Sequence, residues 1–279
     1  MSDAWGRQSK AYAEKFQQGP PKVSAEAILK AIDTLLPLEK ASAILDNGCG
    51  TGIGISTLIR SYSHRLPDSS RLVAADLSPK MVSAVEKIKE SHPESNLWSK
   101  LELKVCDVND MSCFDDASLS HIIASLVMFF SNDPDAAFNE AYRTLKPGGA
   151  IGMTSFQRIQ WMDLRNVVQK IRPELAPPQL PPRWASAEWI REQCSKAGFV
   201  DVTVEPTDVF LEVDEPRELA DFLVNSGIPQ VSGIFGSLTT EQKNEVIDLI
   251  VKEVNTNYQK PIRIPGVLLV SSATRRAAK

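Results

Sequence analysis

The sequence predicts an α/β fold that is built on a mostly parallel sheet, and three observations lead to this prediction. In residues 44–54 a short apolar run ends in glycines and an amphipathic stretch follows, which is the pattern of a buried strand, a tight turn and a helix. A second apolar run follows at residues 71–78, so that strand, helix and strand form a parallel unit. Three successive apolar runs end in an acid, at Asp46, Asp76 and Asp107.

Composition narrows the class of protein. The 279-residue chain is 43% hydrophobic and 24% charged, so it can bury a full core as one large domain with additions. A net charge of −4 argues against nucleic acid as a partner, because phosphate backbones are bound by clustered Lys and Arg. The polar N-terminus and the lack of a long apolar run predict no membrane span and a cytoplasmic protein. Three histidines and four cysteines without C-x-x-C spacing predict no metal site and reduced thiols.

The chain before the first strand, residues 1–40, is predicted to form a helical arm or lid. Residues 3–18 have a helical pattern that includes Tyr12, and Gly19 with the two prolines after it breaks the pattern. Ser24 is expected to be the N-cap of a second helix, whose apolar face should pack against the sheet.

The glycine turn predicts a ligand site. Gly48, Gly50 and Gly52 at alternate positions let the backbone turn tightly and approach a ligand closely. Their spacing differs from the G-x-G-x-x-G of dinucleotide folds. Exposed N–H groups at the start of the next helix suit a ligand carboxylate, and Asp46 suits an ammonium group. A glycine-rich turn without a ligand is the alternative.

The other two acids extend this site along the sheet edge. Asp76 ends the second strand, where an acid can accept hydrogen bonds from both hydroxyls of a ribose. Its alternative role is a helix N-cap, although Ser78 ahead of Pro79 can fill that role. Asp107 follows the third strand and taken alone could be a loop carboxylate. Because parallel strands end at one edge, we expect the acids to surround a single ligand.

The linked pattern of Asp46-x-Gly48-x-Gly50-x-Gly52, Asp76 and Asp107 resembles the class I S-adenosylmethionine-dependent methyltransferases. The resemblance implies a Rossmann-like, mostly parallel seven-stranded sheet with an antiparallel last strand and helices on both faces. It also implies S-adenosylmethionine as cofactor and a small molecule as substrate. The sequence of the glycine motif, residues 46–52, is similar to that in small-molecule methyltransferases of fungal secondary metabolism.

The resemblance assigns residues to both halves of the site. Those expected to contact the cofactor are Asp46, Gly48, Cys49, Gly50, Gly52, Asp76, Leu77, Met81, Asp107, Val108, Ser125, Leu126 and Tyr12. Those expected to bind the acceptor are Met128, Phe129, Phe130 and Trp161. Related enzymes often carry histidines at positions 128–130, so an apolar acceptor pocket is predicted here. Packing in the core is the alternative for these side chains.

The fourth and fifth strands follow. The fourth, residues 119–125, contains His121, which we expect at mid-strand; in another register it would be a general base near the acceptor. A helix from Asp133 then leads through Lys146–Gly149, which is similar to the family's helix-to-strand turn and is predicted to be a glycine C′ exit.

The remaining chain adds two insertions to a main domain of residues 41–279. Residues 156–185 are predicted to form a lid over the acceptor site, and a proline-rich interdomain linker is the alternative. Strands at residues 200–213 and 262–273 should pair antiparallel, as in the family. Between them, residues 214–260 are predicted to be a helical cap that includes a Thr-x-x-Gln capping box.

The expected function is methyl transfer to a small, largely apolar metabolite. Without a predicted base, an oxygen that ionises easily, in an acidic phenol or a carboxyl group, is favoured as the acceptor. Transfer to a thiol is the close alternative, and transfer to nitrogen is a further one. A protein that only binds the cofactor, or a member of the fold that catalyses a pericyclic or lyase step, would be a different class. The sequence gives no prediction of the oligomeric state.

Overall fold

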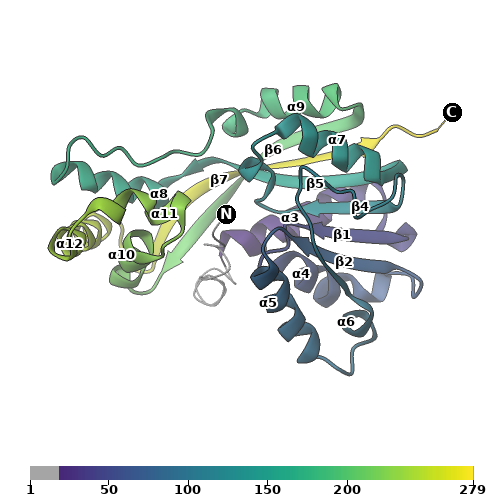
Figure 1. The fold of residues 1–279 in the computed structure, drawn as a ribbon, viewed down its shortest axis with the longest axis horizontal. Coiled ribbons are helices and arrows are strands. Elements are labelled where there is room, and N and C mark those ends of the chain that lie inside the picture. Colours follow the sequence, from purple (N-terminus) through teal and green to yellow (C-terminus); the bar gives the residue numbers. More distant parts are fainter. Residues whose placement is uncertain (1–18, 279) are drawn as a thin grey trace.

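A seven-stranded sheet forms the centre of the protein in the computed structural model, which describes residues 19–278 (Figure 1). The strands are β1 (Ala43–Asn47), β2 (Arg71–Asp76), β3 (Glu102–Val105), β4 (Leu119–Ala124), β5 (Leu145–Ile159), β6 (Phe199–Val213) and β7 (Ile262–Arg275). Their order is β3-β2-β1-β4-β5-β7-β6. Strands β1 to β5 pair in parallel, and β7 pairs antiparallel with β5 and β6. The predicted fold class is confirmed.

Helices cover both faces of the sheet (Figure 1). They are α3 (Pro20–Leu35), α4 (Ile53–Tyr62), α5 (Pro79–Glu90), α6 (Asn96–Lys100), α7 (Pro134–Thr144), α8 (Gln160–Asp163), α9 (Ala187–Lys196), α10 (Pro216–Asn225), α11 (Pro229–Ser232) and α12 (Thr240–Asn257). Helices α3, α4 and α5 share one hydrophobic core with the sheet, and α7 and α9 share a second core on the other face. In β1, Ile44 belongs to the first core while Ala43 and Leu45 belong to the second, as the alternation of side chains along a strand requires.

A cap lies at one end of the sheet, where three strands extend beyond the others (Figure 1). Strands β5, β6 and β7 contain 15, 15 and 14 residues. Helices α8, α10, α11 and α12, with residues 164–170, pack on these extensions and form a third hydrophobic core. Helix α12 begins with the predicted capping box, in which Thr239 and Gln242 each accept the backbone N–H of the other. No helix among residues 19–278 is long and apolar enough to cross a membrane.

A buried cation ties the cap together. The guanidinium of Arg165 donates to the carbonyl oxygens of Met162, Pro178, Gln230 and Val231. Burial lowers the pKa of Arg165 to about 10, and the nearby charge of Asp163 opposes this shift. The Arg165 side chain therefore connects α8, α11 and the loop that contains Pro178.

The predicted N-cap at Ser24 is wrong. Helix α3 begins at Pro20, because proline has the backbone angle of a first helical turn and has no N–H that needs a partner there. Ser24 is instead inside the helix and fully buried. Its hydroxyl lies 2.7 Å from those of Ser125 and Thr154, so it links α3 to the residue after β4 and to the middle of β5. The predicted packing of this helix on the sheet is confirmed, and the arm predicted for residues 3–18 lies outside the described residues.

The predicted glycine exit after α7 is also wrong. The helix ends in an extended Leu145, which already pairs with β4, and Lys146–Gly149 form an irregularity within β5. A Cβ on Gly149 would lie 2.9 Å from the carbonyl oxygen of Lys146 and 3.0 Å from that of Ser120. A glycine is therefore needed, but at a bulge in the strand.

The contact between α3 and β5 provides a test of the core. A Cβ on Gly152 would lie 2.6 Å from Cγ2 of Ile28 and 2.7 Å from Cγ2 of Ile32. We expect Gly152→Ala to lower the free energy of unfolding in urea by about 1–3 kcal/mol, because the close-packed helix must move. Gly236→Ala is the control, since no described atom lies within 4 Å of its Cβ position. Equal stability of the two variants would contradict this packing.

Candidate active site

Three loops meet at the carboxyl edge of the parallel strands and are tied to one another by the backbone. The N–H groups of Gly48 and Cys49 donate to the carbonyl oxygen of Ala75, at 2.8 and 2.9 Å. The N–H of Cys106 donates to the carbonyl oxygen of Asp76 at 3.1 Å. The ends of β1, β2 and β3 therefore form one connected surface, as the position of the three acids predicts.

The glycine loop packs closely at Gly48 and is open at Gly50. Gly48, Gly50 and Gly52 have φ values of +71°, +53° and +88°, which favour glycine. A Cβ on Gly48 would lie 2.2 Å from Cγ2 of Val127, so glycine lets the chain after β4 pack against the loop. A Cβ on Gly50 would meet no described atom within 4 Å. Among residues 19–278, no atom therefore fills the space above Gly50.

Asp46 is buried behind this loop. Its Oδ2 accepts the N–H of Ile55 in the first turn of α4 at 2.7 Å. Gly54 makes this approach possible, because a Cβ there would lie 2.6 Å from Oδ2. The other oxygen, Oδ1, is buried and has no hydrogen-bond partner among residues 19–278. Burial, with a smaller contribution from Asp76, raises the pKa of Asp46 to about 7, while the bond from Ile55 opposes the shift. A buried oxygen without a donor suits a cationic ligand group.

Asp76 faces the same opening from β2. Its Oδ2 accepts the N–H of Gly50 and its Oδ1 accepts the N–H of Ser78, both at 2.9 Å. The Ser78 hydroxyl in turn accepts the N–H of Met81, so Ser78 caps α5, as expected. These bonds fix the orientation of the Asp76 carboxylate between the glycine loop and α5.

Leu77 and Met81, both expected to contact the cofactor, differ in exposure. Leu77 has 59% of its surface exposed and presents an apolar side chain at the site. Met81 is only 3% exposed. Of this pair, Leu77 is therefore the side chain that is open to a ligand.

The loop after β3 carries Asp107 and Val108. Asp107 Oδ1 accepts the backbone and side-chain N–H groups of Asn109. The Asn109 side-chain oxygen accepts the hydroxyl of Ser131 at 2.5 Å. Val108 is half-buried against the core. The loop therefore connects the end of β3 to the segment that follows β4.

The chain after β4 is strained and held by hydroxyl groups. Leu126 has a φ of +55°, which is uncommon for a residue with a side chain and marks a constrained position. Thr154 Oγ1 accepts its N–H at 3.0 Å, and Ser24 bonds to both Thr154 and Ser125. Our sequence prediction included Ser125 and Leu126 but missed Ser24 and Thr154, whose roles depend on contacts between distant segments.

The predicted acceptor residues do not all line an opening. Met128 and Phe129 are 1% and 5% exposed and belong to the core, because the 3-10 turn at residues 128–130 directs them inward. This corrects the prediction of a pocket lined by both. Phe130 remains 39% exposed. Trp161 is buried in the cap, where its ring fills the space beside Gly266.

A row of aromatic rings joins the core to the cap. The ring centroids of Phe129 and Phe130 are 4.5 Å apart, and those of Phe129 and Phe156 are 6.3 Å apart. Phe156 in turn meets Trp161 edge-on at 5.7 Å. The half-buried Phe156, which the sequence did not single out, packs against both the core beneath the site and the core of the cap.

His121 lies at mid-strand, as expected. It pairs with Ile44 and Ala150 across the sheet and is fully buried. Its Nε2 lies 2.9 Å from the carbonyl oxygen of Leu36, and burial lowers its pKa. The register that would place it as a base near the acceptor is not observed.

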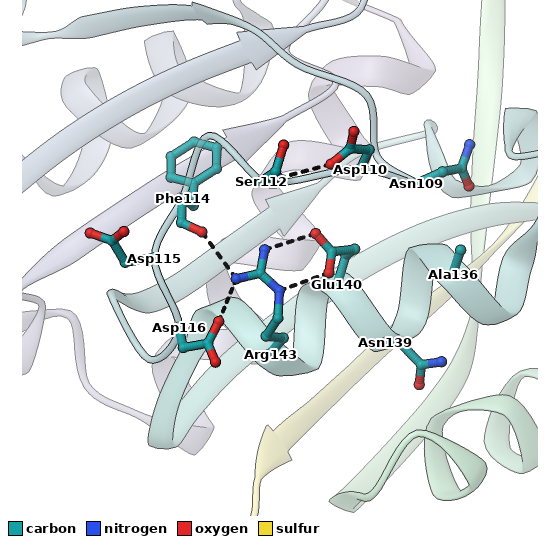
Figure 2. A pocket seen from close by; sticks show the side chains of 10 residues that line it. All are labelled: Asn109, Asp110, Ser112, Phe114, Asp115, Asp116, Ala136, Asn139, Glu140 and Arg143. Carbon is teal, nitrogen blue, oxygen red and sulfur yellow. Dashed lines mark hydrogen bonds and ion pairs between the residues drawn. The ribbon is translucent and has the colours of Figure 1, made fainter.

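A separate surface hollow lies beside α7 (Figure 2) and has a volume of about 530 Å³. Arg143 occupies its centre, where it pairs with Glu140 and Asp116 and donates to the carbonyl oxygen of Phe114. Arg143 thus holds the loop that contains Phe114 and Asp116. This hollow has polar walls and we assign it no ligand.

Comparison with known proteins agrees with this geometry. Residues 45–153 match the methyltransferase domain family. Methyltransferase ucsB of an Acremonium species is 30% identical over 254 residues, which cover 90% of this chain and 88% of that protein. Acetylaranotin bis-thiomethyltransferase of Aspergillus terreus is 24% identical over 219 residues, 74% of this chain and 71% of that protein.

A solved structure has a similar fold. Phosphoethanolamine N-methyltransferase 2 of Haemonchus contortus, in complex with phosphomonomethylethanolamine and S-adenosylhomocysteine, has a TM-score of 0.57 and 19% identity. The match covers 97% of this chain and 57% of that one.

The fold and the carboxyl edge define a class I S-adenosylmethionine-dependent methyltransferase. The chain belongs to the methyltransferase family, and S-adenosylmethionine is its cofactor.

The buried Asp46 gives a prediction for stability. Because its pKa rises from 3.8 to about 7 on folding, the folded protein keeps a proton that the unfolded chain releases between these values. Wild-type stability should therefore fall as the pH rises through this window. Asn at this position carries no charge and can still accept the Ile55 N–H. We expect the free energy of unfolding of Asp46→Asn to rise relative to that of wild type between pH 4 and pH 7, by about 2–4 kcal/mol in total.

Urea unfolding of both proteins from pH 4 to pH 8 measures this difference. Comparing two proteins at each pH cancels the contribution of the other titrating groups. A difference that stays constant across the range would show that Asp46 is ionised in the folded state.

Proposed function

We propose that this methyltransferase methylates an ionisable oxygen, in an acidic phenol or a carboxyl group, on a small and largely apolar secondary metabolite. The observation that carries the proposal is the chemistry at the end of β4. Exposed Phe130 and half-buried Phe156 are apolar, and all three histidines of the chain lie elsewhere. His64 and His92 are exposed beyond α4 and α5, and His121 is enclosed in the sheet. An acceptor that ionises in water needs no such base.

The cofactor fits the carboxyl edge in one orientation. The unpartnered Oδ1 of Asp46 would accept from the methionyl ammonium, and the open space above Gly50 would receive the methionyl chain. Asp76 would accept from the ribose hydroxyls. Asp107, Val108 and exposed Leu77 would contact the adenine. Backbone groups at Ser125 and Leu126 would then lie between the cofactor and the acceptor.

Catalysis would come mainly from positioning. S-adenosylmethionine supplies a methyl group on a sulfonium sulfur. An oxygen nucleophile would attack the methyl carbon in line with the carbon–sulfur bond, and S-adenosylhomocysteine would leave as a neutral thioether. The strained Leu126 backbone and its bond to Thr154 would hold the acceptor wall rigid beside the cofactor. Holding both reactants at the attack distance removes a large entropic part of the barrier. Phe130 and the cap would exclude water from the acceptor.

A thiolate acceptor is the second candidate. It is favoured by the similarity to a protein named acetylaranotin bis-thiomethyltransferase. Thiols also ionise without a strong base, so the same apolar wall would serve. An assay of S-adenosylhomocysteine release with phenols, carboxylic acids, thiols and amines separates these classes, and transfer only to amines would overturn the proposal.

Asp76 provides the first test of the cofactor position. We expect Asp76→Ala to weaken S-adenosylhomocysteine binding by about 1–3 kcal/mol, because the ribose hydroxyls lose their acceptor in a partly buried place. Calorimetry measures the affinity, and Asp68→Ala at an exposed loop position is the matched control. Gly50→Val should abolish binding, since its side chain would enter the open space. Normal affinity in both site variants would mean that the cofactor lies elsewhere.

Phe130 provides a test of the acceptor side. We expect Phe130→Ala to raise KM for the acceptor about tenfold, through loss of apolar contact area, while KM for S-adenosylmethionine stays unchanged. Phe210, a phenylalanine on β6 with a similar exposure of 37% against 39% for Phe130, is the control. Phe210→Ala should leave both constants unchanged. If the two variants behave alike, Phe130 does not contact the acceptor.

The pH dependence of turnover tests the absence of a base. With two acceptors of different acidity, the rate should rise with pH and level off at the pKa of each acceptor. His121→Gln should lower stability but keep this profile, because the imidazole is enclosed in the sheet. A midpoint that is the same for both acceptors would instead indicate a titrating group of the protein.

A further inference from the structure

Two cysteines meet at the loop that follows β3. Cys106 directly follows the strand and is buried, whereas Cys113 is exposed. Their sulfur atoms lie 3.1 Å apart, and both are thiols. The chain between them contains Asp107 and Val108, the residues proposed to contact the adenine. A spacing of seven residues matches no recognised motif, and the sequence predicts four reduced thiols and not this pair.

We propose that Cys106 and Cys113 form a reversible disulfide, and that this bond controls the position of the adenine-binding loop. The thiol part depends only on the contact between the two sulfur atoms. The effect on the loop rests on the proposed function. Isolated disulfides of this kind in reducing compartments are usually transient and regulatory.

The Cys106–Cys113 disulfide forms by thiol–disulfide exchange with a small disulfide such as oxidised glutathione. The exposed Cys113, as a thiolate, attacks one sulfur of the glutathione disulfide and releases one glutathione thiolate. The Cys106 sulfur then attacks Cys113 Sγ in the mixed disulfide and releases the second. The two protein thiols lose two electrons and two protons, which reduce glutathione disulfide to two glutathione thiols.

The hydrogen bonds that hold the loop determine which residues move when the disulfide forms. A disulfide has a sulfur–sulfur distance of about 2.05 Å, so the two sulfurs must approach by about 1 Å. Met111 is fixed through its N–H to Glu140 and its carbonyl oxygen to Arg143, and Arg143 also holds the carbonyl of Phe114. Figure 2 shows the bonds from Arg143 to Phe114 and Glu140. The contraction therefore falls on Cys113 and on residues 107–110. Displacement of Asp107 and Val108 then stretches the bonds that join Asn109 to Asp107 and to Ser131.

The other two cysteines serve as internal controls. Cys49 and Cys194 are buried, and burial raises the pKa of both thiols, to about 12 for Cys194. Thiols of this kind react slowly, because the thiolate is the nucleophile. Burial raises the pKa of Cys106 as well, so its reaction depends on the 3.1 Å contact of its sulfur with that of the exposed Cys113. The first attack on glutathione disulfide should therefore be confined to Cys113, and the protein disulfide to the Cys106–Cys113 pair.

Mass spectrometry tests the bond directly. The chain has no Lys or Arg between Lys104 and Arg143, so trypsin leaves both cysteines in one peptide, residues 105–143. After treatment with oxidised glutathione we expect this peptide to lose about 2 Da, from two hydrogen atoms, and to regain them with dithiothreitol. Persistent attachment of glutathione to Cys113, or unreacted thiols, would overturn the proposal.

Calorimetry with S-adenosylhomocysteine tests the effect on the loop. We expect the oxidised wild-type protein to bind three- to tenfold more weakly than the reduced protein, and dithiothreitol to restore the affinity. Cys113→Ser, an exposed substitution that removes the bond, should bind equally well before and after treatment. Unchanged affinity in the oxidised wild type would overturn control of the loop. If neither redox form binds, the proposed cofactor site fails, whereas the mass measurement still decides the disulfide.

Discussion

The buried carboxylate of Asp46 holds the carboxyl edge of the sheet together. It accepts the N–H of Ile55, and so fixes the first turn of α4 against the end of β1. That approach is possible only because Gly54 has no Cβ. With the helix fixed, the glycine loop between them has little freedom, and its Gly50 N–H is directed at Asp76 on the next strand. One buried acid thereby positions the glycine loop and Asp76. Its burial disfavours the charged carboxylate, as the raised pKa of Asp46 shows.

The second half of the site depends on three strands that are longer than the others. Extension of β5, β6 and β7 gives the cap its own hydrophobic core, and the buried Arg165 connects α11 to the loop that contains Pro178. The aromatic row through Phe129, Phe156 and Trp161 makes this core continuous with the core beneath β4. The proposed acceptor wall is therefore packed between two cores, which would suit a reaction that depends on fixed positions more than on a protein acid or base.

The parts that sequence predicts well are those that depend on neighbouring residues. Apolar runs give the strands, and strand ends give the edge where Asp46, Asp76 and Asp107 gather. Local hydrogen bonds give caps such as Thr239, which the structure confirms. Two wrong predictions are local, the N-cap at Ser24 and the glycine exit after α7, and a third concerns packing between distant segments. Met128 and Phe129 follow a strand as pocket residues would, but a 3-10 turn directs them into the core. Ser24 has a capping residue's chemistry, yet prolines start the helix earlier and leave its hydroxyl to join two strands. The meeting of Cys106 and Cys113 likewise depends on the path of a whole loop.

The central claim, that the buried Asp46 receives the ammonium group of the cofactor, can be measured as a proton count. At pH 6 the free protein holds a proton on Asp46, whose pKa is about 7. An ammonium beside the carboxylate favours its charged form and expels that proton. Calorimetric titration with S-adenosylhomocysteine in two buffers of different ionisation enthalpy should give release of about 0.5–1 proton per molecule bound by wild type, and close to none for Asp46→Asn. Equal proton release by the two proteins would contradict the claim.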